Sequence, residues 1–302
     1  MIVYIIIGGI IMIDLHTHTK YSDGTFSVKE LLTEAEKTGV TLLSITDHDK
    51  LSAHIEMQDF NVKEYYTGKI IVGTEFSASH EGKRIELLGY GFDISKVKPW
   101  LDKMYNREKM NQDNIMEFKE IYQICKEKGL KVTENLEYIP TDYPVDVVYY
   151  DIKKYEENKK FFTDEEWNNI DVFWRKCSNN KDFILYWDFT KRIPSSKEVS
   201  ELIRNAGGKV FVAHIFKYQV DDHIEMLDSL VNNDIIDGVE VYYSAFNDEQ
   251  IKFLENYCKK RNLYMSAGSD FHGMKKKDRK IGIGYGNMNV QEDVVQNWIK
   301  EI

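Results

Sequence analysis

Short apolar runs rich in β-branched residues recur along the chain, and most of them are followed by a segment with helical periodicity. Strands that alternate with helices are typical of a parallel sheet with both faces covered. Seven such runs over this length predict a β/α barrel or a relative of one. The expected strands are Ile10–Leu15, Val40–Thr46, Ile70–Gly73, Ile85–Tyr90, Val210–Ala213, Gly238–Tyr242 and Leu263–Ala267, and the expected helices between them include Val28–Thr38, His223–Asn232 and Asp248–Arg261.

A long central stretch interrupts this alternation of strands and helices. It begins with Asn106–Lys128, which reads as one long helix, and it continues with many aromatic and charged residues. We therefore expect a barrel formed by residues 12–100 and 194–302, with a mostly helical insertion over residues 101–193. The insertion is either a lid over the active face, which we favour, or a small packed subdomain.

Polar residues of the types that bind metals stand at the ends of these apolar runs, in six separated segments. Five of the eight histidines fall just past the carboxyl end of an expected strand. Active sites of barrel enzymes are built at that face. The residues concerned are His16, His18, Asp23, His48, Glu75, Glu86, His214, Asp270 and His272.

The spacing of these residues suits metal binding. Residues i and i+2 of a strand point to the same side, so His16 and His18 can bind one ion as a pair, and Asp270 and His272 can do the same. Imidazole suits Zn and Fe, carboxylate also suits Mn, and Glu75 has two oxygens with which to bridge two ions. An isolated H-x-H pair is a weak signal, but the joint pattern predicts a hydrolytic site with several metals.

Composition narrows the class of protein further. The chain has 302 residues, of which 42% are hydrophobic and 30% charged, so a sizeable core is expected and general disorder is not. The formal net charge of −10 argues against a long nucleic acid as partner, although local basic patches could still hold a short nucleotide. The three cysteines are isolated from one another, which fits a reducing, cytoplasmic setting.

The first eleven residues are apolar but too few to span a bilayer, which needs roughly 20 residues. They have no basic region or cleavage site of a signal peptide, so no membrane association is expected. Our hypothesis is that translation begins at Met12, and the alternative is a longer first strand.

The polar residues form a series of motifs along the chain. In order, these are Asp14-x-His16-x-His18 with Ser22-Asp23-Gly24, Thr46-Asp47-His48-Asp49, Gly73-Thr74-Glu75, Ala213-His214 and Gly268-Ser269-Asp270-Phe271-His272-Gly273. As a set, the motifs resemble those of the PHP (polymerase and histidinol phosphatase) superfamily. The similarity covers about residues 12–95 and 195–290, and the long helical insertion resembles the branch that contains nucleoside bisphosphate and AMP phosphatases and related exoribonucleases.

The resemblance implies a distorted (β/α)7 barrel that holds two to three divalent metal ions (Mn, Zn or Fe). Carried over by position, the ligands of the first ion are His16, His18, Glu75 and Asp270, those of the second are Asp23, His48 and His272, and those of the third are Glu75, His214 and a residue of the fourth strand.

The fourth-strand ligand departs from the pattern of this branch, which usually has histidine there. This chain has Glu86 at the aligned position. Three alternatives follow: Glu86 binds the ion directly, His80 folds in to replace the histidine, or the third site is weak or empty. A carboxylate in that place would shift the site towards harder ions such as Mn.

The function implied is hydrolysis of a phosphate ester by a metal-bound hydroxide. The expected substrate is a small phosphomonoester, with a nucleotide as first choice, histidinol phosphate as second, and a short nucleic-acid end cleaved exonucleolytically as third. Asp47 is expected to orient a metal-bound histidine or water. Candidates for phosphate contacts, by position, are Lys20, Lys50, Arg84 and Lys217.

Two other classes of protein compete with this interpretation. Amidohydrolases also begin with an H-x-H pair on a barrel strand, but they commonly use a modified lysine as bridging ligand, and none of the apolar runs ends in lysine. The second rival is an inactive, metal-stabilised binding module. The nearly complete ligand set favours an enzyme.

Overall fold

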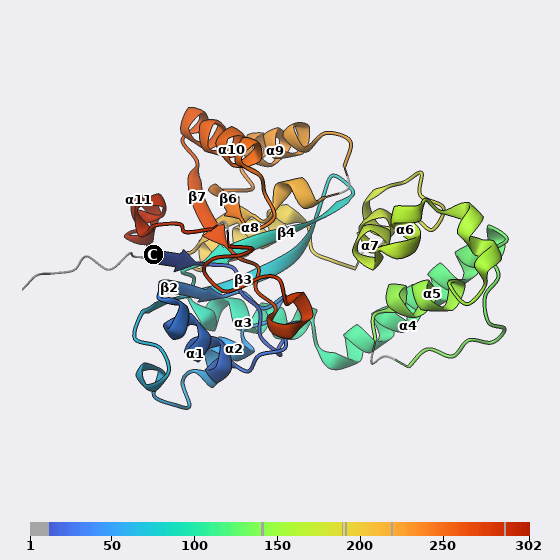
Figure 1. Cartoon of the computed structure of the whole chain (residues 1–302), viewed down its shortest axis with the longest axis horizontal. Coiled ribbons are helices and arrows are strands. Elements are labelled where there is room, and N and C mark those ends of the chain that lie inside the picture. Colours follow the sequence, from blue (N-terminus) through green and yellow to red (C-terminus); the bar gives the residue numbers. More distant parts are fainter. Residues whose placement is uncertain (1–11, 140–141, 189, 191, 219, 287) are drawn as a thin grey trace, which may run out of the picture.

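The computed structural model describes residues 12–139, 142–188, 190, 192–218, 220–286 and 288–302. The hypothesis of a start at Met12 and its alternative concern residues 1–11, which lie outside the described residues. Within the described part of the chain, one sheet contains seven strands whose spatial order is their order in the sequence (Figure 1). The strands are β1 (Met12–Asp14), β2 (Val40–Ile45), β3 (Lys69–His80), β4 (Lys83–Tyr90), β5 (Lys209–Val212), β6 (Gly238–Tyr243) and β7 (Tyr264–Gly268).

The sheet closes on itself between its first and last strands. The N–H of Leu15 donates to the carbonyl of Ala267 at 2.9 Å, and the N–H of Asp270 donates to the carbonyl of His16 at 2.8 Å. The predicted distorted barrel of seven strands is therefore confirmed. One expectation was wrong: the sheet is not parallel throughout, because β4 runs antiparallel to both β3 and β5.

The helices on the outside of the barrel begin and end where the local sequence predicts. Ser27 and Glu30 form a reciprocal capping box at the start of α1 (Val28–Thr38), and Gly39 ends the helix with a left-handed φ of 78°. The other barrel helices are α2 (Ser52–Glu56), α3 (Ile94–Met104), α8 (Ser196–Asn205), α9 (His223–Asn232), α10 (Asp248–Arg261) and α11 (Gln296–Ile299).

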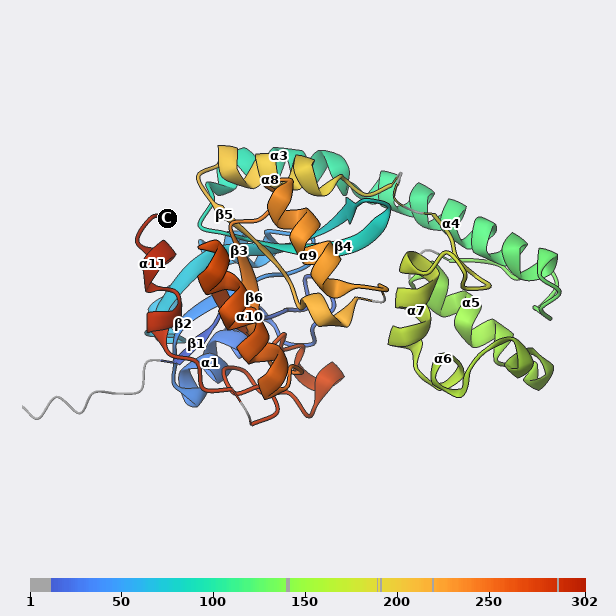
Figure 2. The same cartoon turned by 90° about the horizontal axis from the view of Figure 1, so that it is seen from above.

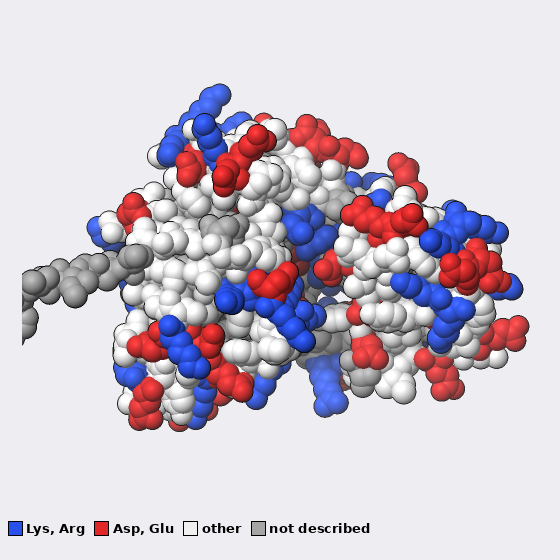
Figure 3. Space-filling model, viewed as in Figure 1, with Lys and Arg blue, Asp and Glu red and all other residues white. Residues whose placement is uncertain are grey.

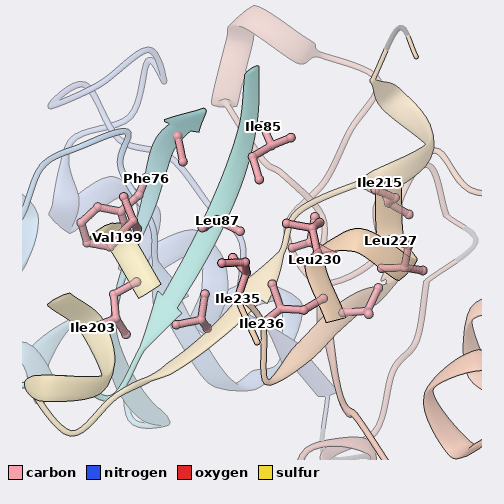
Figure 4. Packing of buried hydrophobic residues seen from close by; sticks show 14 of the residues in the cluster. Phe76, Ile85, Leu87, Val199, Ile203, Ile215, Leu227, Leu230, Ile235 and Ile236 are labelled. Carbon is pink, nitrogen blue, oxygen red and sulfur yellow. The ribbon is translucent and has the colours of Figure 1, made fainter. Parts of the chain in front are cut away.

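Three apolar cores hold the barrel together. The largest core lies between the sheet and its outer helices, where Phe76, Ile85 and Leu87 of β3 and β4 face α8 and α9 (Figure 4). A second core fills one end of the barrel, where the indole of Trp298 is fully buried against Tyr90. A third core packs α1 against β2.

Four α-helices of the described residues form a separate lobe beside the barrel (Figure 2). Their buried residues make an apolar cluster of their own within residues 118–187. The preceding helix α3 still belongs to the barrel, because its Leu101 packs in the largest barrel core. The first helix of the lobe begins at Arg107. Its helices are α4 (Arg107–Glu127), α5 (Pro144–Ile152), α6 (Asp164–Asn168) and α7 (Ile170–Asn179). Among the described residues, no helix has both the length and the apolarity that crossing a bilayer requires.

A half-buried acid on α4 predicts how stability changes with pH. Burial raises the pKa of Glu117 from 4.5 to about 7, although the charges of Arg84 and Arg192 act to lower it. The folded state then binds more protons than the unfolded state between these two values, so the free energy of unfolding should fall as pH rises from 4.5 to 7. Glu117→Gln should flatten this part of the profile in urea unfolding experiments. The exposed change Glu127→Gln on the same helix should leave it parallel to wild type, and equal profiles for both variants would contradict the prediction.

Candidate metal centre

The site begins where the chain leaves β1 with His16 and His18. The two residues are spaced as i and i+2, and both imidazoles are fully buried. Strand β7 ends beside them in Gly268, where an added Cβ would lie 2.1 Å from the Cβ of His16. This position therefore needs glycine because the neighbouring chain approaches so closely.

One carboxylate, that of Glu75 on β3, lies between four histidines. Its Oε2 is 3.1 Å from Nε2 of His16, 3.2 Å from Nε2 of His18 and 3.3 Å from Nδ1 of His48. Its Oε1 is 3.0 Å from Nε2 of His214. The two oxygens thus face different sets of ligands, which is the arrangement a bridging carboxylate needs.

A second group of ligands surrounds Asp23. Its Oδ1 lies 3.1 Å from Nε2 of His272 and 3.7 Å from both Nδ1 of His18 and Nε2 of His48. One ligand atom from each of these four residues lies within 4.8 Å of the others. The ring of His272 donates from Nδ1 to the carbonyl of Asp270 at 2.8 Å, which leaves the lone pair of Nε2 for an ion.

The third group contains Glu86 and His214 beside Glu75. Because β4 is reversed, its first residues lie at the same edge as the last residues of the parallel strands. Nε2 of His214 is 3.0 Å from Glu75 and 3.4 Å from Oε2 of Glu86. His48, Glu75 and Glu86 also offer ligand atoms within 4.8 Å of one another. Glu86 itself therefore reaches the cluster.

His80, the alternative suggested for the third-metal histidine, lies outside the cluster in the structure. Strand β3 continues five residues beyond Glu75, and at about 3.3 Å per residue His80 is roughly 16 Å further along the strand. Its Nδ1 is 2.8 Å from the hydroxyl of Ser196, and its Nε2 is 2.9 Å from that of Ser229. The ring thus fastens β3 to α8 and α9.

One carboxylate oxygen of Asp270 faces His16 and His18, and the other accepts hydrogen bonds from three groups. Its Oδ1 is 3.7 Å from Nε2 of His16 and 3.4 Å from Nε2 of His18. Its backbone has a left-handed φ of 54°, a strained conformation for this residue type that is often found at functional sites. The groups that hold Oδ2 are the hydroxyl of Tyr243 at 2.8 Å, the ammonium of Lys276 at 3.0 Å and the guanidinium of Arg279.

Glu240 on β6 orients two of the histidines, and the sequence reasoning missed it. This fully buried carboxylate accepts a hydrogen bond from Nδ1 of His16 at 2.7 Å and one from the backbone N–H of His214 at 2.8 Å. Nδ1 of His16 is thereby engaged, and Nε2 is directed at Glu75. The available signal was an acid inside the apolar strand Gly238–Tyr243.

Asp47 lies behind the cluster and contacts it through hydroxyl groups. It accepts hydrogen bonds from the hydroxyls of Thr19 and Ser22, both at 2.6 Å. The hydroxyl of Ser22 is 3.4 Å from Nδ1 of His18. This placement suits the orienting role that the sequence suggested for Asp47.

The charges of the cluster shift one another strongly. Burial acts to lower the pKa of His18, but the neighbouring carboxylates of Asp270 and Glu75 outweigh it and raise the pKa to about 9. Burial acts to raise the pKa of Glu75, but the charges of His16 and His48 hold it well below 4.5. The carboxylates are therefore ionised, and positive charge is required around them.

The residues present fit divalent ions. Nε2 of His18 and Oδ1 of Asp23 are buried without hydrogen-bond partners and belong to the same ligand group. Buried polar atoms are normally satisfied, so such a pair indicates a ligand at this point. Mixed imidazole and carboxylate ligands suit Mn, Fe and Zn.

Three of the four lysines and arginines suggested for phosphate contacts are exposed or engaged by other groups. Lys20 is exposed, and Lys50 donates to the backbone carbonyl of Tyr21 at 2.6 Å. Arg84 lies under the helical lobe, with its guanidinium 4.5 Å from the ring centre of Trp174.

The fourth candidate, Lys217, is half-buried three residues after His214. Burial and then the charges of Arg175 and Arg279 lower its pKa, so other cations lie close to it. The ammonium of Lys275, which the sequence reasoning missed, is 3.1 Å from Oδ2 of Asp23. Lys and Arg side chains accordingly gather where the barrel faces the lobe (Figure 3).

Comparison with known proteins identifies the family to which this chain belongs. The PHP domain family matches residues 14–280. A 5′–3′ exoribonuclease of Haemophilus influenzae is 27% identical over 266 residues, which cover 86% of this chain and 89% of the relative.

Two solved structures share the fold over most of both chains. A protein assigned as a metal-dependent phosphoesterase, from Bifidobacterium adolescentis, covers 95% of each chain at 21% identity with a TM-score of 0.62. An amidohydrolase from Chromobacterium violaceum covers 96% of this chain and 95% of its own at 18% identity, with a TM-score of 0.66. At these identities the structures show a common fold alone, so the name of the second does not support the rival class. Because the family match spans most of the chain, the protein belongs to the PHP domain family and is a metal-dependent phosphoesterase.

Proposed function

We propose that the protein hydrolyses a small phosphomonoester, with a nucleotide as the first choice of substrate. The observation that carries the proposal is the position of Glu75, whose two oxygens face four imidazoles from three different segments. Histidine and carboxylate ligands around a shared carboxylate are well suited to a site that holds ions a few Å apart for hydrolysis.

The ligand groups would hold two to three divalent ions of Mn, Zn or Fe. The first group would contain His16, His18, Glu75 and Asp270, the second Asp23, His48 and His272, and the third Glu75, Glu86 and His214. When bound, such ions lower the pKa of coordinated water to roughly 7 and neutralise the charge on phosphoryl oxygens.

The protein's own contribution is to fix which ring nitrogen of a ligand histidine carries the proton. Glu240 holds Nδ1 of His16, and the carbonyl of Asp270 holds the Nδ1 proton of His272, so each ring presents Nε2 to the centre. Asp47 acts on His18 through the hydroxyl of Ser22. Ligands oriented in this way need little reorganisation when charge develops on the substrate.

Cations around the centre suit an anionic substrate although the chain carries a net charge of −10. Lys276 and Arg279 contact Asp270, and Lys275 contacts Asp23. A local group of cations attracts a phosphate even where the overall charge repels a long polyanion.

A second candidate function is removal of nucleotides from the end of a short nucleic acid. The observation that favours it is the relative named 5′–3′ exoribonuclease, which this chain matches over 89% of its length. The basic surface between barrel and lobe could hold the phosphates that follow the first nucleotide (Figure 3).

A substrate panel tests both candidates. The purified chain with added Mn should release phosphate from nucleoside monophosphates or bisphosphates, and a chelator should abolish the release. Histidinol phosphate and a short RNA with a 5′ phosphate complete the panel. Release of single nucleotides from the RNA without phosphate release from the small esters would favour the exonuclease. Turnover that resists chelation would contradict the metal centre altogether.

The bridging role of Glu75 predicts the effect of one substitution. Glu75→Gln removes the charge that faces four histidines, so kcat should fall by about 10²-fold or more, with loss of bound metal. The control is His80→Gln, because His80 is a buried histidine outside the cluster. That variant should retain metal and activity within about twofold. A Glu75→Gln enzyme with normal metal content and kcat would rule out the role.

Direct binding by Glu86 predicts a change in metal stoichiometry. Glu86→Ala should lower the metal content measured by elemental analysis by about one ion per chain, because His214 and Glu75 alone make a poor site. Glu86→His should restore it, since imidazole can replace the carboxylate as a ligand. Equal metal content in wild type and Glu86→Ala would show that Glu86 is not a ligand.

A further inference from the structure

The helical lobe is fastened to the barrel beside the metal centre. Strand β5 pairs with β4 over Leu87–Tyr90, and the N–H of Ala213 donates to the carbonyl of Glu86, so the edge of β4 before Glu86 is not covered by β5. Asn179, the last residue of α7, takes that place. Its Oδ1 accepts the N–H of Arg84 at 2.6 Å, and its Nδ2 donates to the carbonyl of Arg84 at 3.2 Å. Asn179 is only 2% exposed, so water competes little for these bonds.

A second contact fixes the rotation of α7 on the strand. The guanidinium of Arg84 lies over the ring of Trp174 at 4.5 Å, and Lys83 donates to the carbonyl of Asn179 at 2.8 Å. Arg84 is two residues from Glu86. The lobe is therefore attached where the third ligand group begins.

This attachment brings Arg175 of α7 to the centre. Arg175 follows Trp174 directly and stands one helical turn before Asn179, so its half-buried side chain lies on the face of α7 that meets β4. Its charge interacts with Glu86, which belongs to the third ligand group, and with Tyr243, which contacts Asp270.

Lys217 of the barrel stands three residues after the ligand His214 and is half-buried. It lies close enough to Arg175 for the two charges to act on one another, and Asp171 is the nearby acid that offsets the charge on Lys217. Neighbouring cations in a half-buried place repel one another, and an anion between them relieves the repulsion. A guanidinium with its planar set of donors is well suited to grip a phosphoryl group by two bonds.

We propose that Arg175 is a substrate-binding residue supplied by the helical lobe, which grips the phosphoryl group together with Lys217 of the barrel. The inference rests on the proposed function, because it assigns to the lobe a part in holding the same phosphate ester. It gives the lobe a specific task as a lid. The barrel provides the ion ligands, and the lobe provides an anion contact from the opposite side.

Binding of inorganic phosphate to the purified, metal-containing chain tests the proposal directly. In titration calorimetry, Arg175→Ala should weaken phosphate binding by about tenfold to a hundredfold, the range for loss of a charged hydrogen-bonding group. Arg175→Lys should recover part of the loss, because it keeps the charge but not the fork of donors. Lys181→Ala removes an equal charge from an exposed position just after α7 and should change binding by less than about twofold.

A double-mutant cycle with Lys217→Ala shows whether the two cations act on one anion. If they do, the two losses should be less or more than additive, whereas separate sites give additive losses. In turnover assays, Arg175→Ala should raise KM with unchanged metal content. A merely structural role would instead lower the melting temperature and would not be rescued by lysine.

The outcomes separate this inference from the proposed function. Chelator-sensitive hydrolysis with the same phosphate affinity and KM in wild type and Arg175→Ala overturns the inference and leaves the function standing. Phosphate binding that depends on Arg175, in a protein that hydrolyses none of the panel, supports the inference as an anion site and overturns the function. Undetectable phosphate binding by wild type overturns the inference.

Discussion

The buried carboxylate of Glu75 is the interaction on which the rest of the structure depends. Removing an ionised carboxylate from water is unfavourable by several kcal/mol unless opposite charge and hydrogen bonds replace the water. Four imidazoles do this here, and they come from segments that follow β1, β2 and β5. Their sequence separation means that no local segment can satisfy Glu75. The barrel has to close before this charge is compensated, so the fold and the site form together.

Closure of the barrel is secured just behind the same residues. Asp14, at the end of β1, accepts hydrogen bonds from the N–H and hydroxyl of Ser269 and from the N–H of Gly282. Glu240 joins β6 to the segments that follow β1 and β5. These buried carboxylates fix ligand directions through backbone and ring N–H groups. The positions of the ion ligands are thus set by the sheet and its loops together, which is the rigidity that hydrolysis requires.

Much of this arrangement could be predicted from the sequence because it depends on local patterns. The capping residues Ser27 and Gly39 fix the ends of α1, and polar residues after apolar runs identify the carboxyl edge of the barrel. The reversal of β4 could not be predicted, because alternating burial has the same period in either direction. The positions of Lys276 and Arg279 depend on the path of a long loop, which leaves no periodic signal. Glu240 was visible as an acid in an apolar strand, but its partners were not.

The barrel and the helical lobe have different parts in the chemistry. All the groups of residues that could hold an ion, among those described, come from the barrel, and the helical lobe adds the charge of Arg175, which interacts with Glu86. Ions of charge +2 need anionic and imidazole ligands held rigidly, which a closed sheet supplies. Recognition of the remainder of a substrate needs a surface that can vary without disturbing those ligands. A lobe fastened to the open edge of β4 by Asn179 meets that requirement, because changes in its other helices leave the ligand strands intact. Differences in substrate between proteins that share this barrel are therefore expected to lie in the inserted lobe rather than in the ligand set.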